Sequence, residues 1–344
     1  MTAQATQLIH RSQRQFTEAF AHQLVAHLNR LRQETHPDDP PVNPEHVWGQ
    51  MQHLPPLLEL DLWTVEDSSG IHAHARTQLM NTEDNQHLAD LELMVAPDWR
   101  GRGVGGSLLR HAAQAMQARG RSLLLARTTD RVPAGEAFAA HCGFTPGLAN
   151  HENQLLLSDL PGGLLERWTT RPADGYTLEV WEGEVPEADL AAYAALLSVM
   201  NSAPRGDLKA EDTTVSAQEV RELEGLSRAG GRVSLTAVVR APDGTLAGLN
   251  DLSWRASQPG IVSQGNTGVL AAHRGHGLGR WLKAANVAHL RRLSPQAREI
   301  RTQNADSNSA MLKINTEMGF RPFMATTIWQ GEIDTILSRL PRED

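Results

Sequence analysis

Two short arginine–glycine segments have the residue spacing of phosphate-binding loops. The first is RGRGVGG at residues 100–106, and the second is RGHGLGR at residues 274–280. Read from Gly101, the first spells G-x-G-x-x-G, the pattern of dinucleotide loops; read from Arg100, it spells R-x-x-G-x-G, the pattern of acyl-CoA pyrophosphate loops. The second copy keeps only R-x-x-G-x-G, because Arg280 stands where the first has Gly106. The shared pattern therefore favours acyl-CoA.

The chemistry of such a loop depends on its backbone. N–H groups at the start of a helix bind a pyrophosphate, and glycines let the backbone approach it without a Cβ in the way. The arginine at the head of each copy adds positive charge or a hydrogen bond that orders the loop. The alternative is a glycine-rich strand-to-helix turn with no ligand. The predicted cofactor-binding residues of the two loops are Arg100, Gly101, Arg102, Gly103, Val104, Gly105 and Gly106, and Arg274, Gly275, His276, Gly277, Leu278, Gly279 and Arg280.

The two loops belong to a longer internal repeat. The copies lie 174 residues apart, about half of the 344-residue chain, and HCGF at residues 141–144 recurs as EMGF at residues 317–320. Each loop follows an apolar strand and precedes a helix with apolar periodicity. The repeat predicts a first domain at residues 1–163, a linker at 164–176 and a second domain at 177–344.

Composition limits the other classes of function. Hydrophobic residues make up 40% of the chain, enough for two cores, and the net charge of −8 argues against a nucleic-acid or membrane-surface partner. No signal peptide and no run of 18 apolar residues is found, so we expect a cytoplasmic protein. One cysteine, Cys142, excludes an internal disulfide, and the 15 histidines show no H-E-x-x-H spacing, so no metal is predicted.

Through VAPDWRGRGVG with HCGF, and through VLAAHRGHGLG with NADSNSAMLKINTEMGF, the chain resembles the GNAT superfamily of acyl-CoA N-acetyltransferases, and specifically its tandem members. The resemblance implies an α/β (α+β) fold of two tandem domains, each a mixed, mostly antiparallel sheet with a splayed pair of strands and flanking helices. The pantetheine arm would enter between the splayed strands. The strand backbones implied to meet it are those of Leu93, Met94 and Val95 and of Thr267, Gly268 and Val269.

The same resemblance implies further contacts with coenzyme A. Asn304 and Asn308 match asparagines that follow the fifth strand in the family, whereas TTDRVPAGEAF in the first half has none. Many members supply a proton to the leaving thiolate from a tyrosine whose positions here are Ala139 and Asn315. The chain therefore lacks this acid in both halves.

Candidate groups on the acceptor side are mostly acidic. Glu92, beside Asp90 on the predicted fourth strand, is the candidate base, and its counterpart Asn266 is predicted to orient a substrate. Asp207, Glu211 and Asp212 are predicted to receive a cationic amine. A solvent-facing strand glutamate and a solvated charged loop are the alternatives for these two groups.

The sequence thus predicts an acetyl-CoA-dependent N-acetyltransferase that transfers the acetyl group directly to a small-molecule amine. We also expect the second half to carry most of the turnover, because its motif is the more complete. A catalytically degenerate CoA-binding regulatory module is the alternative. A nucleotide-binding oxidoreductase, suggested by G-x-G-x-x-G and Asp130, conflicts with the second copy. The acceptor and the oligomeric state are not determined by the sequence.

Overall fold

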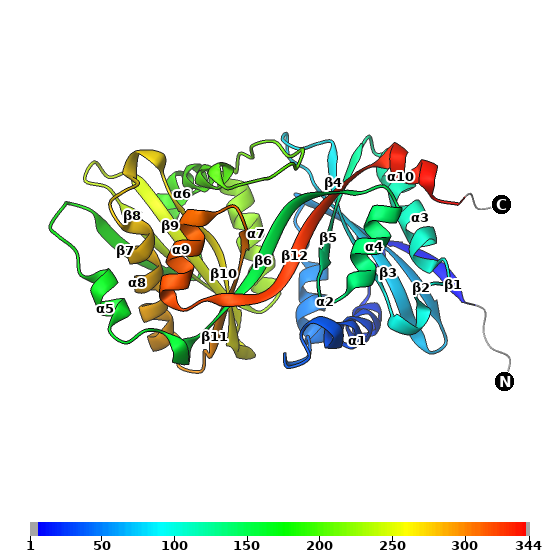
Figure 1. Cartoon of the computed structure of the whole chain (residues 1–344), viewed down its shortest axis with the longest axis horizontal. Helices are drawn as coiled ribbons and strands as arrows, with labels where there is room; N and C mark the ends of the chain where they lie inside the picture. The colour runs from blue at the N-terminus through cyan, green and yellow to red at the C-terminus, as the bar shows by residue number, and fades with distance from the viewer. Residues whose placement is uncertain (1–5, 342–344) are drawn as a thin grey trace. The chain divides into compact units, whose positions relative to one another are not determined.

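A computed structural model describes residues 6–341, which form two compact units (Figure 1). Unit 1 contains residues 6–149, 205–211 and 325–341 of this part, and unit 2 contains residues 150–204 and 212–324. Neither unit is one continuous stretch of sequence. The final strand of each half is responsible for most of this interleaving.

Unit 1 is built on the strands and helices of the first half together with the end of the chain. Its elements are β1 (Gln7–Ser12), α1 (Glu18–Thr35), α2 (Pro44–Gln52), β2 (Leu58–Asp67), β3 (Gly70–Met80), β4 (Leu88–Val95), α3 (Val104–Ala118), β5 (Leu123–Thr129), α4 (Pro133–His141), most of β12 (Arg321–Glu332) and α10 (Ile333–Arg339).

Unit 2 repeats this order with its own elements. These are most of β6 (Thr145–Leu156), α5 (Leu164–Thr169), β7 (Thr177–Glu182), α6 (Leu190–Leu196), the 3₁₀ helix η5 (Leu197–Ser202), α7 (Ala217–Ala229), β8 (Arg232–Arg240), β9 (Leu246–Arg255), β10 (Gln258–Val269), α8 (Leu278–Leu293), β11 (Glu299–Ala305) and α9 (Ser309–Met318).

The two sheets have the same topology. The strand order is β1-β2-β3-β4-β5-β12 in unit 1 and β7-β8-β9-β10-β11-β6 in unit 2. Neighbours are antiparallel except for one parallel pair in each sheet, β4 with β5 and β10 with β11. The predicted mixed, mostly antiparallel sheets are confirmed.

The last strand of each half completes the sheet of the other half. Strand β6 is the last strand of the first half and pairs with β11, with Leu155 opposite Ile300. Strand β12 ends the second half and pairs with β5, with Trp329 opposite Ala126 (Figure 1). The compact units therefore differ from the contiguous halves that the repeat suggests.

Residues 164–176, which the repeat suggests as a linker, contain helix α5. Its Leu164 and Leu165 are buried with residues of α8 and β11 in a core of unit 2. Gly163 begins this helix at φ 66°, a conformation that glycine adopts at little cost. The segment is thus part of the packing of unit 2.

Amphipathic helices cover the sheet of unit 1. Thr17 caps α1 by accepting a hydrogen bond from the Phe20 backbone N–H at 3.2 Å, and α1 buries Leu24 and Leu31 on one side. Helix α3 packs its apolar side into a core that also contains Leu91 of β4 and Ala126 of β5. The parallel pair β4–β5 therefore has α3 on one face.

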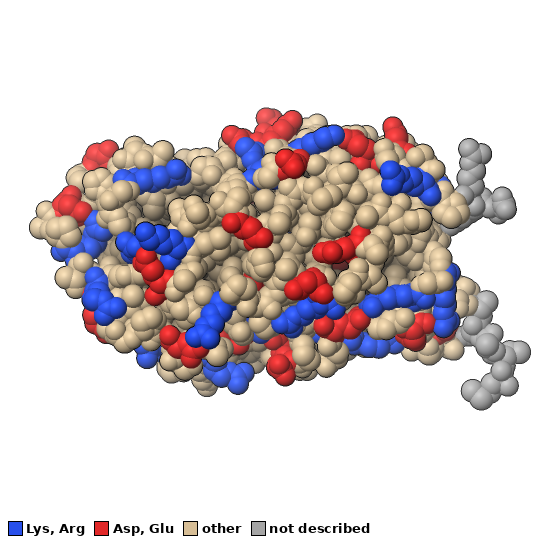
Figure 2. All heavy atoms as spheres, in the orientation of Figure 1, with Lys and Arg blue, Asp and Glu red and all other residues tan. Residues whose placement is uncertain are grey.

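Positive and negative side chains alternate on the surface. Figure 2 shows Lys and Arg interspersed with Asp and Glu over the face in view, without a large patch of one sign there. None of the described helices is both long and apolar enough to cross a membrane.

Candidate active site

The parallel strands of unit 1 separate halfway along their length. They are paired from Leu88 with Leu123 as far as Leu91 with Ala126. Beyond that point Leu93 and Val95 of β4 have no β5 partner and pair only with β3 on the other side. This leaves backbone groups of β4 available to a ligand at residues 93–95, where the resemblance implies contact with the pantetheine arm.

A cavity of about 1000 Å³ lies at this opening, entirely within unit 1. It is bounded by the ends of β4 and β5, by the loop at residues 100–106, by α4, and by α1 on the other face of the sheet. Predicted cofactor residues that line it are Leu93, Met94, Val95, Arg100, Gly101, Gly103, Gly105 and Gly106. The splay and the loop thus open into one space.

The loop has the geometry of an anion cradle. Gly101 and Gly103 have φ of 74° and 80°, and a Cβ added to either would meet nothing within 4 Å. Gly103 is also the N-cap of α3, so the first N–H groups of that helix are open to a phosphate. These residues fit the pyrophosphate of coenzyme A, which would bind at the N-terminus of α3.

Arg100 orders this loop. Its Nε donates to the Val95 carbonyl oxygen at 3.0 Å, and its two terminal nitrogens bind the Glu34 carboxylate at 2.9 and 2.6 Å. The side chain joins the end of β4, the loop and α1. Of the two roles expected for this arginine, its contacts favour the loop-ordering hydrogen bond.

Unit 2 repeats this loop geometry. Gly275 and Gly277 have φ of 84° and 72°, and Gly277 is the N-cap of α8. Arg274 Nε donates to the Val269 carbonyl oxygen at 3.1 Å. Here Arg171, from the segment after α5, also donates to the His276 carbonyl oxygen at 2.9 Å. The second loop is therefore fastened from two sides.

The parallel strands of unit 2 also separate. Their pairing ends at Ser263 with Arg301, before Thr267 and Val269. Past that point the buried Gln264 donates to Thr302 Oγ1 at 3.2 Å, which links β10 to β11 through side chains.

Glu92 lines the cavity of unit 1 and is held by two partners. Its carboxylate lies 3.1 Å from His74 Nε2 and 3.1 Å from Arg76. Burial raises the pKa of Glu92, but the charges of Arg76 and Arg127 and the contact with His74 outweigh it and lower the pKa to about 2. Glu92 is therefore an ionised, weakly basic carboxylate at neutral pH, suited to holding an ammonium group.

In unit 2 the acidic group sits one strand away from the position of Glu92. Asn266, the counterpart of Glu92, bonds the side chain of Asp251 on β9, which also accepts a hydrogen bond from Tyr193 Oη at 3.3 Å. Burial raises the pKa of Asp251 to about 6. Sequence reasoning missed Asp251, because it belongs to neither repeated motif.

The asparagines predicted to contact coenzyme A carry structural hydrogen bonds. Asn308 caps α9 by accepting from the Met311 backbone N–H at 3.2 Å. Asn304 accepts from Asn315 Nδ2 at 2.7 Å, and Asn315 in turn accepts from the buried ammonium group of Lys283. Burial lowers the pKa of Lys283 to about 7.

Lys283, Asn315 and Phe320 occupy positions that correspond through the repeat to Leu109, Ala139 and Phe144. The latter three line the unit 1 cavity. Phenylalanine is kept in both units, whereas Lys283 and Asn315 form a polar cluster with Asn304 where unit 1 has apolar side chains.

The acidic segment predicted to bind an amine is divided between the units. Asp207 and Glu211 belong to unit 1, whereas Asp212 belongs to unit 2. The Asp207 backbone oxygen accepts from Gln330 at 2.7 Å, and Glu211 accepts from the Asn85 backbone N–H at 3.3 Å. Asp207 and Glu211 thus pack with unit 1.

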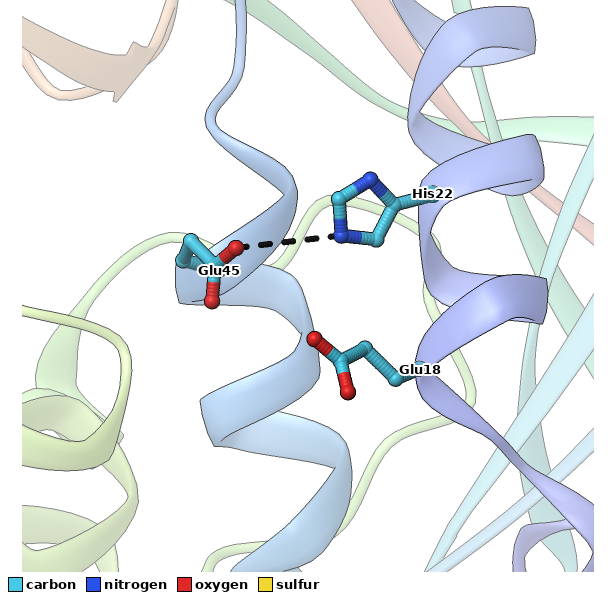
Figure 3. A group of neighbouring side chains, drawn as sticks. All are labelled: Glu18, His22 and Glu45. Atoms are coloured by element: carbon cyan, nitrogen blue, oxygen red, sulfur yellow. Dashed lines mark ion pairs between the residues drawn. The ribbon is translucent and has the colours of Figure 1, made fainter.

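Glu18, His22 and Glu45 come together on the surface of unit 1 (Figure 3). Their ligand atoms lie within 4.8 Å of one another, and His22 Nε2 is 3.8 Å from Glu45. Exposed acidic groups commonly gather in this way without an ion, so this cluster alone defines no metal site. The expectation that the protein needs no metal stays a prediction.

Known proteins are similar to this chain in sequence and in fold. A family model described as acetyltransferase (GNAT) domain matches residues 59–146. A mycothiol acetyltransferase of Nocardia farcinica (strain IFM 10152) is 30% identical over 238 residues, which cover 69% of this chain and 72% of the relative. The chain belongs to the GNAT family of acetyltransferases, and acetyl-CoA is its acyl donor.

Solved structures extend the likeness over both units. A tandem GNAT protein from the clavulanic acid biosynthesis pathway has 25% identity and a TM-score of 0.79, with 99% of this chain and 100% of that chain covered. A GCN5-related N-acetyltransferase from Sphaerobacter thermophilus has 16% identity and a TM-score of 0.66, with 98% and 97% covered. The predicted tandem GNAT architecture is confirmed.

Proposed function

We propose that unit 1 transfers the acetyl group of acetyl-CoA directly to the amine of a small molecule. The observation that supports this most is the cavity, because it joins the pyrophosphate loop, the splayed end of β4 and the carboxylate of Glu92. The name mycothiol acetyltransferase associates the curated relative with a small molecule. A cytoplasmic location is part of the same proposal.

The roles follow from the positions of the groups. The loop and the N-terminus of α3 would bind the pyrophosphate, and backbone groups of Leu93 and Val95 would hold the pantetheine and the thioester. Acetyl-CoA supplies the activated acyl group. Glu92 would bind the ammonium form of the acceptor and orient the nitrogen after it loses a proton to solvent.

The reaction needs no acid at the position of the missing tyrosine. The neutral amine nitrogen forms a bond to the carbonyl carbon and gives a proton to water, the carbon–sulfur bond breaks, and the thiolate takes its electron pair. A thiol has a pKa of about 8.5, so the thiolate leaves readily and takes a proton from water. Ala139, which lines the cavity at that position, leaves room for the pantetheine.

This assignment reverses the expectation that the second half carries most of the turnover. That expectation rested on Asn304 and Asn308, which are engaged in bonds within unit 2, and on the acidic segment APRGDLKAED, of which residues 205–211 belong to unit 1. The polar cluster around Lys283 stands where the unit 1 cavity has apolar lining. We therefore place the transfer in unit 1.

Two matched glycine variants test the proposal. An added Cβ would lie 3.3 Å from Phe138 at Gly105 and 3.4 Å from Ile314 at Gly279, so the two sites are similarly crowded. Gly105→Asp adds a carboxylate that repels the pyrophosphate, and we expect kcat/KM for acetyl-CoA to fall at least about 100-fold. Gly279→Asp is expected to change it less than about threefold.

Gly105→Ala and Gly279→Ala control for bulk without charge. The assay follows thiol release from acetyl-CoA over a panel of amines, with calorimetric binding of coenzyme A alongside. Loss confined to Gly279→Asp would move the chemistry to unit 2. Binding of coenzyme A without amine-stimulated thiol release would favour the regulatory module instead.

A further inference from the structure

Arg127 stands out among the charged residues of the unit 1 cavity. Five arginines line it, and four are engaged with partners: Arg32 with Asp39, Arg76 with Glu92, Arg100 with Glu34, and Arg110 with the carbonyl oxygens of Leu340 and Pro341. Within residues 6–341, the side chain of Arg127 makes no hydrogen bond and has no carboxylate oxygen within 4.0 Å of its guanidinium. It is therefore a cation in the cavity wall with no direct partner.

The position of Arg127 relative to the splay is informative. The last β4–β5 pair is Leu91 with Ala126, and both residues pack into the core beneath α3. Glu92 and Arg127 are the next residue on each strand, so the alternation of side chains places both on the opposite face. They flank the opening between the strands, on the side away from α3 and its pyrophosphate loop.

Glu92 and Arg127 carry opposite charges but form no direct ion pair with each other. Arg127 is near enough to lower the pKa of both Glu92 and Asp90, yet it contacts neither directly. Glu92 is engaged by Arg76 and His74. A small molecule at the opening would meet a carboxylate on one strand and an uncommitted guanidinium on the other.

We infer that the acceptor of unit 1 is a zwitterion, an amine that also carries a carboxylate, with Glu92 binding the amine and Arg127 the carboxylate. This rests on the proposed function and names its substrate class. A planar guanidinium binds a carboxylate through two parallel N–H donors, so Arg127 would fix the orientation as well as the charge of the acceptor. Neutral and purely cationic amines lack this second anchor.

The experiment compares amines that differ only in the carboxylate. The pairs are L-alanine with ethylamine, L-phenylalanine with phenethylamine and L-lysine with cadaverine, and taurine and O-phosphoethanolamine test other anions. We expect wild type to prefer the carboxylate-bearing member by at least about tenfold in kcat/KM, the usual size of a charge-assisted hydrogen bond. Arg127→Gln should remove this preference. KM for the amino acid should rise, and KM for its decarboxylated partner should change little.

Two variants sharpen the comparison. Arg127→Lys keeps the charge without the two-pronged geometry and should restore part of the preference. Arg291→Gln removes an exposed arginine on α8 of unit 2 and controls for net charge. It should leave the preference unchanged.

The outcomes separate the inference from the proposed function. Equal rates for both members of each pair, a preference for the sulfonate or phosphate amine, or a preference that Arg127→Gln retains would overturn the inference and leave acetyl transfer standing. A rise in KM for acetyl-CoA with Arg127→Gln would assign the arginine to the donor. Thiol release with none of the amines, in protein that binds acetyl-CoA, would refute both.

Discussion

Lys283 in unit 2 gives the most quantitative prediction. Its side chain is fully buried, and its Nζ donates to Asn315 Oδ1 and lies 5.0 Å from the centre of the Phe320 ring. None of the carboxylates in residues 6–341 forms an ion pair with it. Burial lowers its pKa from 10.5 to about 7. The folded state thus favours the neutral amine. The folding cost of the charged form is fully present below pH 7 and disappears as the pH rises towards the pKa of the unfolded state.

The perturbation is Lys283→Leu, which copies Leu109 from the equivalent place in unit 1. Each unit of pKa shift corresponds to about 1.4 kcal/mol, so the stability of wild type relative to this variant should rise by up to about 5 kcal/mol from pH 6.5 to pH 10.5. Asn315 loses its partner in the variant, a cost of about 1–3 kcal/mol that does not depend on pH. The double variant with Asn315→Ala, matching Ala139, removes that cost.

The assay can observe the ammonium group directly. The chain contains only three lysines, Lys209, Lys283 and Lys313, so lysine labelled with ¹³C at Cε gives three NMR signals, and Lys283→Arg assigns one of them. Urea unfolding of wild type and variant across the same pH range measures the change in stability. A Lys283 signal that titrates near 10.5, together with a stability difference constant with pH, would refute the reasoning.

The carboxylates of Glu92 and Asp251 yield two further predictions. Glu92→Gln should lower kcat/KM for the amine about 10- to 100-fold, as expected for a lost charged hydrogen bond, with KM for acetyl-CoA unchanged. Because the pKa of Glu92 is already about 2, the shape of the pH–rate profile between about pH 5 and pH 9 should stay the same, and a shifted acid limb would show that Glu92 acts as a base. The pKa of Asp251 is raised from 3.8 to about 6, so its contribution to the stability of wild type is lost as the pH rises through this range. Asp251→Asn should therefore stabilise the protein at pH 8 by up to about 3 kcal/mol. This advantage should vanish near pH 4. Urea unfolding measures the stability difference between variant and wild type at pH 8 and pH 4, and an equal difference at both would contradict the prediction.

The repeat in the sequence predicted a duplicated domain, and the resemblance to the GNAT superfamily implied the mixed sheet of each copy. Glycine spacing marks the turn from β4 into α3 and from β10 into α8, because positive φ at Gly103 and Gly277 is what those turns require. The sequence does not reveal which sheet receives a final strand. The edge of either sheet offers unpaired backbone groups to a final strand, so the pairing of β6 and β12 does not follow from the edges alone.

The site was less predictable, for a similar reason. Motif spacing locates Glu92 but not His74 and Arg76, which reach it from β3 across the sheet. Asp251 belongs to neither repeated motif, and Arg127 matches Arg301 in the repeat, 174 residues later. Both residues matter because of the side chains that they do or do not meet in three dimensions. The repeat aligns Lys283 with Leu109. A charged residue at a position that is apolar in unit 1 was a signal that the interior of unit 2 differs there.

The exchange of final strands has a consequence for synthesis on the ribosome. Unit 1 is encoded first, yet its sheet lacks β12 and α10 until the last residues of the chain emerge. Unit 2 contains the chain only as far as Met324, so it can complete its sheet earlier. During translation the edge of β5 therefore waits with unpaired backbone groups while most of the chain is made, an edge of the kind on which strands of other molecules add. Unit 1 begins the sequence, yet the strand that completes its sheet is the last of the described strands to be synthesised.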